Sequence, residues 1–113
     1  MKAKSIIDAG ICGFQTNVQA DSPDSQTVQI SMDSPCEKIQ ALGKAIQALG
    51  PIDSLDEISP RTPSRLMNAA QTTLKGCCAG CVVPVGIFKA MQVAAGLALP
   101  KDIAIGLSKT EDA

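Results

Sequence analysis

The chain has no histidine, no tryptophan and no tyrosine among its 113 residues, and it has only two phenylalanines. The lack of histidine removes the commonest general base at neutral pH and the commonest metal ligand. It also excludes every serine or cysteine triad that needs an imidazole. The scarcity of aromatic side chains argues against nucleic-acid binding through base stacking. If a metal binds to this chain, its ligands are thiolates, carboxylates or both.

Strong charge and long apolar runs are also missing. The net charge is −1 and no basic block occurs, so the chain lacks the electrostatic signature of phosphate binding. No apolar run reaches the roughly 18 residues of a membrane-spanning helix, and MKAKSIIDAG is too short and polar for a signal peptide. We therefore expect a cytoplasmic protein without nucleic-acid or membrane partners. Thiols stay reduced in that compartment, so clustered cysteines indicate a metal site or catalysis.

The residues that are present fit a single globular domain over residues 1–113, since 45% are hydrophobic and 19% are charged. Alternation of apolar and polar residues predicts strands at 3–9, 14–20, 26–33 and 103–107. Helical spacing predicts helices at 34–50, 62–76 and 84–96, and residues 52–61 are expected to be a loop. The order β-β-β-α-α-α-β predicts an α+β fold: a mainly antiparallel four-stranded sheet with helices packed on one face.

The helix starts carry a repeated signal. Ser34 and Thr62 are each followed by proline, which predicts that they are N-caps with proline at the first helical position. Glu37 completes a capping box with Ser34.

Three of the five cysteines lie in KGCCAGCVVP, residues 75–84. Cys78 and Cys81 form a C-x-x-C, a spacing that lets two sulfurs bind one metal or cluster. Only Cys78 gives this spacing, so Cys77 is predicted to be dispensable. The alternative is that Cys77 replaces Cys78 as a ligand.

The other two cysteines are expected at one end of the sheet. Cys12 follows the first predicted strand, and Cys36 begins the first predicted helix after the third strand. Because the turn at 21–25 reverses the chain, the first and third strands end at the same side of the sheet. The candidate ligands of a shared centre are therefore Cys12, Cys36, Cys78 and Cys81.

Several occupants fit four thiolates. A [4Fe–4S] cluster ranks first, because the apolar flank CVVPVGIF suits a centre whose potential depends on exclusion of solvent. Zinc ranks second, and reduced cysteines without a ligand rank with it. Thiol–disulfide chemistry at Cys78 and Cys81 ranks third, since a helix and not a strand precedes this C-x-x-C.

Three segments resemble a family of small uncharacterised proteins from anaerobic bacteria and methanogenic archaea. They are CGF before an alternating strand, SPC at a helix start, and CVVPVGIFKAMQVAAGLALPKD. The resemblance covers nearly the whole chain and singles out Cys12, Cys36, Cys81, Pro84, Lys89 and Pro100. It implies an anaerobic, cytosolic setting, which favours an oxygen-sensitive cluster, and it implies no particular activity.

The sequence thus predicts a small [4Fe–4S] protein with an electron-transfer or accessory role, serving a larger redox enzyme. One alternative is a protein-interaction module with a structural zinc site of four thiolates. A further alternative is a thiol redox protein that uses Cys78 and Cys81. The largely apolar third helix is compatible with a homo-oligomer, although core burial explains it equally well.

Overall fold

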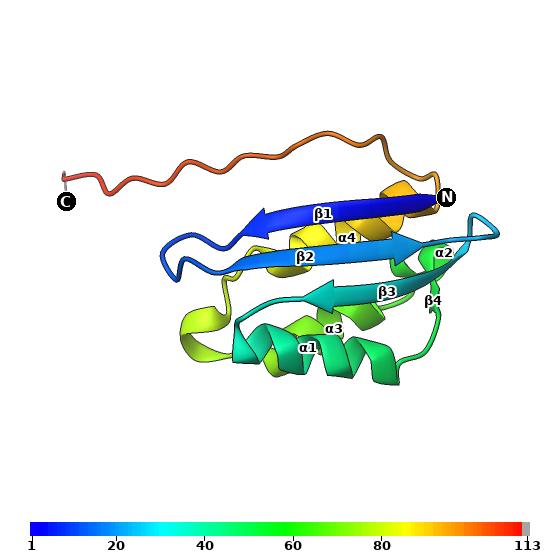
Figure 1. Cartoon of the computed structure of the whole chain (residues 1–113), viewed down its shortest axis with the longest axis horizontal. Coiled ribbons are helices and arrows are strands. Elements are labelled where there is room, and N and C mark those ends of the chain that lie inside the picture. The colour runs from blue at the N-terminus through cyan, green and yellow to red at the C-terminus, as the bar shows by residue number, and fades with distance from the viewer. Residues whose placement is uncertain (112–113) are drawn as a thin grey trace.

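An antiparallel sheet of four strands carries the fold, and the helices pack against one of its faces (Figure 1). The computed structural model describes residues 1–111. The strands are β1 (Lys2–Asp8), β2 (Gln15–Asp21), β3 (Thr27–Asp33) and β4 (Ile52–Asp53), side by side in this order. The helices are α1 (Glu37–Ala48), α2 (Ser54–Glu57), α3 (Arg65–Thr73) and α4 (Val83–Ala94), with a 3₁₀ helix η1 (Gly76–Cys78) before α4. The predicted α+β class with an antiparallel four-stranded sheet is confirmed.

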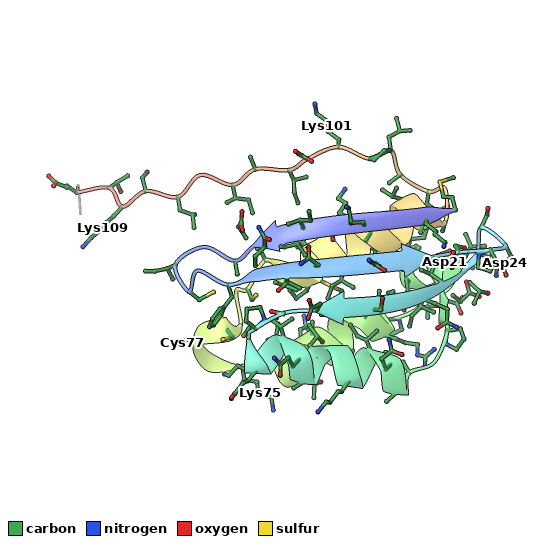
Figure 2. The ribbon with its side chains drawn as sticks, in the orientation of Figure 1. Asp21, Asp24, Lys75, Cys77, Lys101 and Lys109 are labelled. Carbon is green, nitrogen blue, oxygen red and sulfur yellow. The ribbon has the colours of Figure 1, made fainter. Side chains whose placement is uncertain are left out.

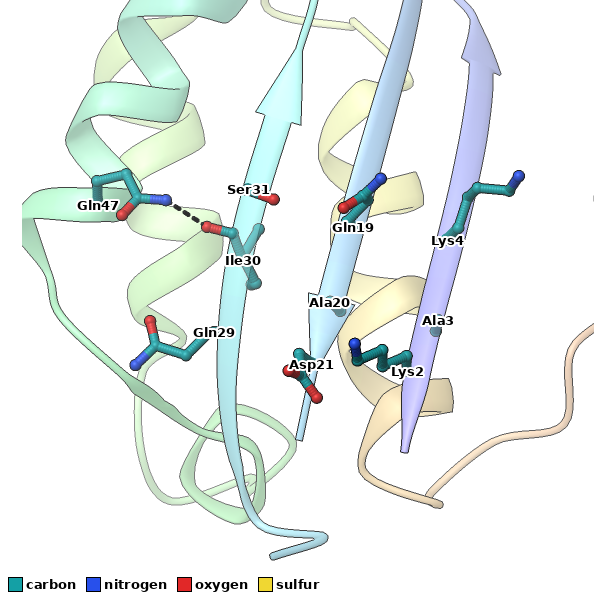
Figure 3. Close-up of a pocket in the computed structure, with 10 residues that line it drawn as sticks. All are labelled: Lys2, Ala3, Lys4, Gln19, Ala20, Asp21, Gln29, Ile30, Ser31 and Gln47. Atoms are coloured by element: carbon teal, nitrogen blue, oxygen red, sulfur yellow. Dashed lines mark hydrogen bonds between the residues drawn. The ribbon is translucent and has the colours of Figure 1, made fainter. Parts of the chain in front are cut away.

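Alternation along the strands separates the two faces of the sheet. In β2, the side chains of Thr16, Val18 and Ala20 are buried under the helices, and the residues between them are exposed. The opposite face is open, and Figure 3 shows polar side chains of β1, β2 and β3, such as Lys4 and Gln19, standing on it. One face thus forms the core and the other faces solvent, as a period of two residues dictates.

Helix α4 packs closely on β1 because a glycine lies at the contact. The Ser5 hydroxyl donates a hydrogen bond of 3.0 Å to the carbonyl oxygen of Gly86. A Cβ atom on Gly86 would lie 2.3 Å from Cδ1 of Ile7, well inside van der Waals contact. The absence of a side chain at this position therefore sets how near the helix approaches the strand.

The fourth strand is not the predicted one. Residues 103–107 are extended but pair with no strand in the described part of the chain, and Ile103 and Ile105 are exposed. The fourth strand is β4, inside the predicted loop at 52–61, where Ile52 pairs with Val28 and is buried. Alternation of apolar and polar residues makes a segment able to form a strand. Whether it pairs depends on burial and on the edge of a neighbouring strand.

The helix starts differ from the prediction by two residues. Helix α1 has Cys36 as its N-cap, and the Ser34 hydroxyl instead accepts hydrogen bonds from the Thr16 hydroxyl and the Cys36 N–H. Helix α3 has Ser64 as its N-cap in place of Thr62, and the Ser64 hydroxyl accepts from Met67 N–H at 3.0 Å. In both cases the helix begins two residues later than the proline signal predicts.

A buried carboxylate holds the start of α3. Glu57, which is 4% exposed, accepts hydrogen bonds from the Ser64 hydroxyl and from the N–H groups of Arg65 and Leu66. The two N–H groups are among the donors that a helix N-terminus leaves without an intrahelical partner. Glu57 thus fixes α3 to the end of α2. None of the helices within residues 1–111 has the length and apolar character needed to cross a membrane.

Candidate thiol site

Three connections that are far apart in the sequence meet at one end of the sheet (Figure 1). They are the β1–β2 turn, the β3–α1 junction and the segment from η1 to the start of α4. β1 and β3 both run antiparallel to β2, so both end on this side. Every cysteine of the chain lies on one of these three connections, and all five are free thiols.

Cys12 lies in the β1–β2 turn. The turn is closed by hydrogen bonds from Gly13 N–H to Gly10 O at 2.9 Å and from Ala9 N–H to Phe14 O at 3.2 Å. Gly10 and Gly13 have φ values of 91° and 75°, which favour glycine. This tight turn holds the Cys12 side chain in solvent at the end of the sheet.

Cys36 lies at the start of α1, directly after β3. Its carbonyl oxygen accepts the hydrogen bond of Gln40 N–H at 2.9 Å, while its side chain makes no capping bond. The thiol is half-buried against the core. The hairpin therefore brings Cys36 to the same end of the sheet as Cys12, where the sequence predicts it.

Successive tight turns shape the segment of Cys78 and Cys81. Ala79 N–H bonds to Gly76 O and Cys81 N–H bonds to Cys78 O, each at 3.1 Å. A bond from residue i+3 back to residue i keeps the two cysteines on one turn. Both side chains are half-buried against the core.

Cys77 differs from its neighbour. Its side chain is exposed, and Figure 2 shows it together with Lys75 on the outer turn at this end of the molecule. The ammonium group of Lys38, in the first turn of α1, donates a hydrogen bond of 3.3 Å to the carbonyl oxygen of Lys75. This bond ties α1 to the cysteine segment.

The electrostatics of Cys81 connect the four predicted ligands. Burial raises the pKa of the Cys81 thiol, and a hydrogen bond from the Val83 N–H lowers it. The thiols of Cys12, Cys78 and Cys36 each raise the same pKa, because a second negative charge nearby disfavours the thiolate. The thiols of Cys12, Cys36 and Cys78 therefore lie close enough to Cys81 to affect its ionisation.

The thiols are neighbours but not yet a closed ligand set. Within residues 1–111, no three Cys, Asp or Glu side chains are already arranged to hold a metal ion. The ligand assignment to Cys12, Cys36, Cys78 and Cys81 stays a prediction.

Two charged side chains at this end have partners that the sequence did not indicate. The carboxylate of Asp8, at the end of β1, accepts a hydrogen bond of 3.1 Å from the Gln15 side chain across the β1–β2 pair. Sequence reasoning also missed Lys38, whose contact with Lys75 joins residues 37 positions apart. The available signal was its place two residues after Cys36, in the first turn of the helix.

These features define a small α+β protein whose antiparallel sheet is covered on one face by helices and carries a group of thiols at one end. The chain belongs to the family described as a family of unknown function (DUF6951), whose model matches residues 3–107. Comparisons with curated proteins and with solved structures found no match. The predicted membership of an uncharacterised family is thus confirmed. The matched range includes all five cysteines.

Proposed function

We propose that Cys12, Cys36, Cys78 and Cys81 bind a [4Fe–4S] cluster at the end of the sheet, and that the protein is a small cytoplasmic electron-transfer or accessory protein. The observation that carries the proposal is the meeting of three separate connections at one end of the sheet, each contributing one or two of these four cysteines. In a cytosolic protein, a thiol group assembled from distant segments indicates a bound centre more than disulfide bonding.

The surroundings of the thiols support a cluster over zinc. Cys36, Cys78 and Cys81 are half-buried against the core, and Val83, two residues after Cys81, is fully buried. The Val83 N–H also donates to the Cys81 sulfur. Apolar cover and N–H bonds to ligand sulfurs are two of the means by which a protein sets the reduction potential of an iron–sulfur cluster.

Each part of the chain has a distinct task in this proposal. The bound cluster would supply one-electron transfer. Cys36, Cys78 and Cys81 provide ligands from the core side, and Cys12 provides one from the solvent side. Lys38, which is bonded to the carbonyl oxygen of Lys75, adds positive charge at this end of the molecule and would offset part of the negative charge of the thiolates. Four thiolate ligands leave no position for a substrate, which favours a role in electron delivery to a larger redox enzyme.

The test is purification of the whole chain without oxygen, followed by absorbance spectroscopy and assays of iron, acid-labile sulfide and zinc. We expect about four iron and four sulfide per chain and a broad visible absorbance, as isolated or after reconstitution with iron and sulfide. A protein that stays colourless and iron-free after reconstitution contradicts the proposal. Zinc near one equivalent without sulfide would assign the same thiols to a structural zinc site. A metal-free protein with a titratable disulfide would indicate thiol redox chemistry.

A further inference from the structure

The free edge of β1 presents unpaired backbone groups. Residues 1 and 22, and residues 9 and 14, are hydrogen-bonded pairs at the two ends of the β1–β2 ladder. Because such pairs alternate with non-bonded pairs, the odd-numbered residues of β1 bond to β2. The N–H and C=O groups that point away from the sheet belong to Lys2, Lys4, Ile6 and Asp8.

The opposite edge of the sheet is closed. Strand β4 pairs with the start of β3 at residues 27 and 28. Further along, the side-chain amide of Gln47 donates to the carbonyl oxygen of Ile30 (Figure 3), and that of Gln40 donates to Ser34 O at 2.9 Å. These contacts cover the β3 edge with α1, and within residues 1–111 no other element pairs with the β1 edge. An open edge of this kind is a template for another strand.

Helix α4 also leaves a strip of side chains incompletely covered next to this edge. Gly86 of α4 faces β1. Residues 82, 89 and 93 lie at helical spacing from Gly86 and therefore share its side of the helix. These residues are Val82, Lys89 and Val93, which are half-buried or exposed. Since β1 is the last strand of the sheet, this border of α4 lies beneath its open edge. A further strand would cover the strip with side chains on its helix-facing side.

The chain itself contains an extended segment that pairs with no strand within residues 1–111. In residues 103–107, Ile103, Ile105 and Leu107 are 54%, 68% and 92% exposed, and Ala104 and Gly106 lie between them. The segment is extended, and the family model continues through its last residue. Three large apolar side chains on one face of an extended segment are the pattern of a strand that is half-buried in a sheet.

We propose that residues 103–107 add to the β1 edge of a second copy of the chain, so that two copies exchange strands in a closed dimer. In its own chain, the segment leaves α4 and runs in the same direction as β1 (Figure 1), so pairing in place would be parallel. All other pairs in the sheet are antiparallel, and parallel pairing is slightly less stable. A second copy can approach the edge in the antiparallel direction.

The connection between α4 and residues 103–107 also favours exchange between copies. Pro100 restricts Leu99 to an extended conformation, which carries the chain away from the end of α4. Each copy then donates one segment and offers one β1 edge, so the two contacts are identical and the assembly closes at two chains. Ile103, Ile105 and Leu107 cover the strip beside β1 on the partner copy, while Ala104 and Gly106 face solvent.

Sedimentation equilibrium of the full chain tests this proposal, with reductant present and one metal state throughout, so that intermolecular disulfides do not contribute. We expect twice the chain mass of 11.6 kDa. Ile105→Lys should weaken the dimer at least tenfold, whereas Ala104→Lys, on the other face of the same segment, should leave it unchanged. Lys4→Pro removes an outward N–H that β2 does not use, so it should weaken the dimer from the acceptor side.

Three results would overturn the proposal. One is a monomer at every concentration. If hydrogen exchange shows protected amides at 103–107 in such a monomer, the segment pairs within its own chain, which also contradicts the proposal. Another is a dimer that Ile105→Lys leaves intact. The third is a dimer equally sensitive to Ala104→Lys. Circular dichroism confirms that each variant is folded, and none of these substitutions touches a cysteine, so the outcome is independent of the cluster.

Discussion

Neighbouring residues in the cysteine segment differ sharply in their surroundings. The 3₁₀ turn leaves Cys77 exposed and presses Cys78 half-buried against the core. One turn later, Cys81 lies beside the start of α4, where the Val83 N–H reaches its sulfur. The three cysteines therefore offer three environments within five positions. Only the two that pack against the core have the apolar cover expected of cluster ligands.

Asp24 gives a residue-level prediction about pH. Its carboxylate, in the β2–β3 turn, accepts hydrogen bonds from Gln26 N–H at 3.0 Å and Thr27 N–H at 2.7 Å. These bonds favour the charged form, so the pKa of Asp24 is lowered. The stabilisation is present above the pKa of the unfolded chain and is lost as pH falls through the folded pKa.

The measurement is urea unfolding of the wild type and of Asp24→Asn at about pH 6 and about pH 3. The asparagine keeps a side-chain oxygen but does not titrate. We expect the wild type to be the more stable of the two at the higher pH and to lose that advantage at the lower pH. An advantage of equal size at both values would contradict the role given to the Asp24 carboxylate.

At the scale of the elements, the helix-covered strands were predictable and the fourth strand was not. Alternation gives β1, β2 and β3 within one or two residues of their observed ends, because one face of each strand packs on the core. The two-residue β4 is too short to show a period, and its place depends on Ile52 reaching Val28. Residues 103–107 have the period but pair with no strand in the described part of the chain.

The helix starts show the same division between local signal and tertiary choice. Both Ser-Pro and Thr-Pro mark the approach to a helix, but in each case the N-cap lies two positions later. The Thr16 hydroxyl bonds to Ser34, and Glu57 bonds to the donors after Ser64, so contacts with distant residues select the cap. Sequence reasoning identifies the signal without seeing these partners.

Two helix glycines give a matched prediction about packing. A Cβ on Gly43 in α1 would meet Met32 Cγ at 3.4 Å, an ordinary contact, whereas one on Gly86 in α4 would lie 2.3 Å from Ile7 Cδ1. Alanine gains about 1 kcal/mol of helix propensity over glycine at either site. Gly43→Ala should therefore stabilise the protein by up to about 1 kcal/mol. Gly86→Ala should be less stable than Gly43→Ala by about 1–3 kcal/mol, because it overpacks the helix–strand contact.

Urea unfolding followed by circular dichroism, with both variants in the same metal state, gives the two free energies of unfolding. The propensity term is common to both substitutions, so the difference between them reports the packing at β1 alone. If Gly86→Ala proves as stable as Gly43→Ala, the close approach of α4 to β1 is not set by this glycine.

Across the whole molecule, the path of the chain brings distant cysteines together. The positions of Cys12 and Cys36 at one end of the sheet follow from a single hairpin, which the turn residues of DSPDS indicate. The position of Cys78 and Cys81 at that same end was less accessible. It depends on the packing of α3 against α1 and α4, and on the bond between Lys38 and Lys75. Contacts of this kind leave no periodic signal in the sequence.

The most direct test of the four-thiolate centre compares single serine variants of cysteines from different connections. Iron and acid-labile sulfide per chain are measured in anaerobically reconstituted wild type, Cys12→Ser, Cys36→Ser and Cys77→Ser. We predict that Cys12→Ser and Cys36→Ser each lower the affinity for the centre by about tenfold or more, since even residues behind the ligands contribute that much. Cys77→Ser should match the wild type. Full iron and sulfide content in both Cys12→Ser and Cys36→Ser would contradict a centre shared by the three connections.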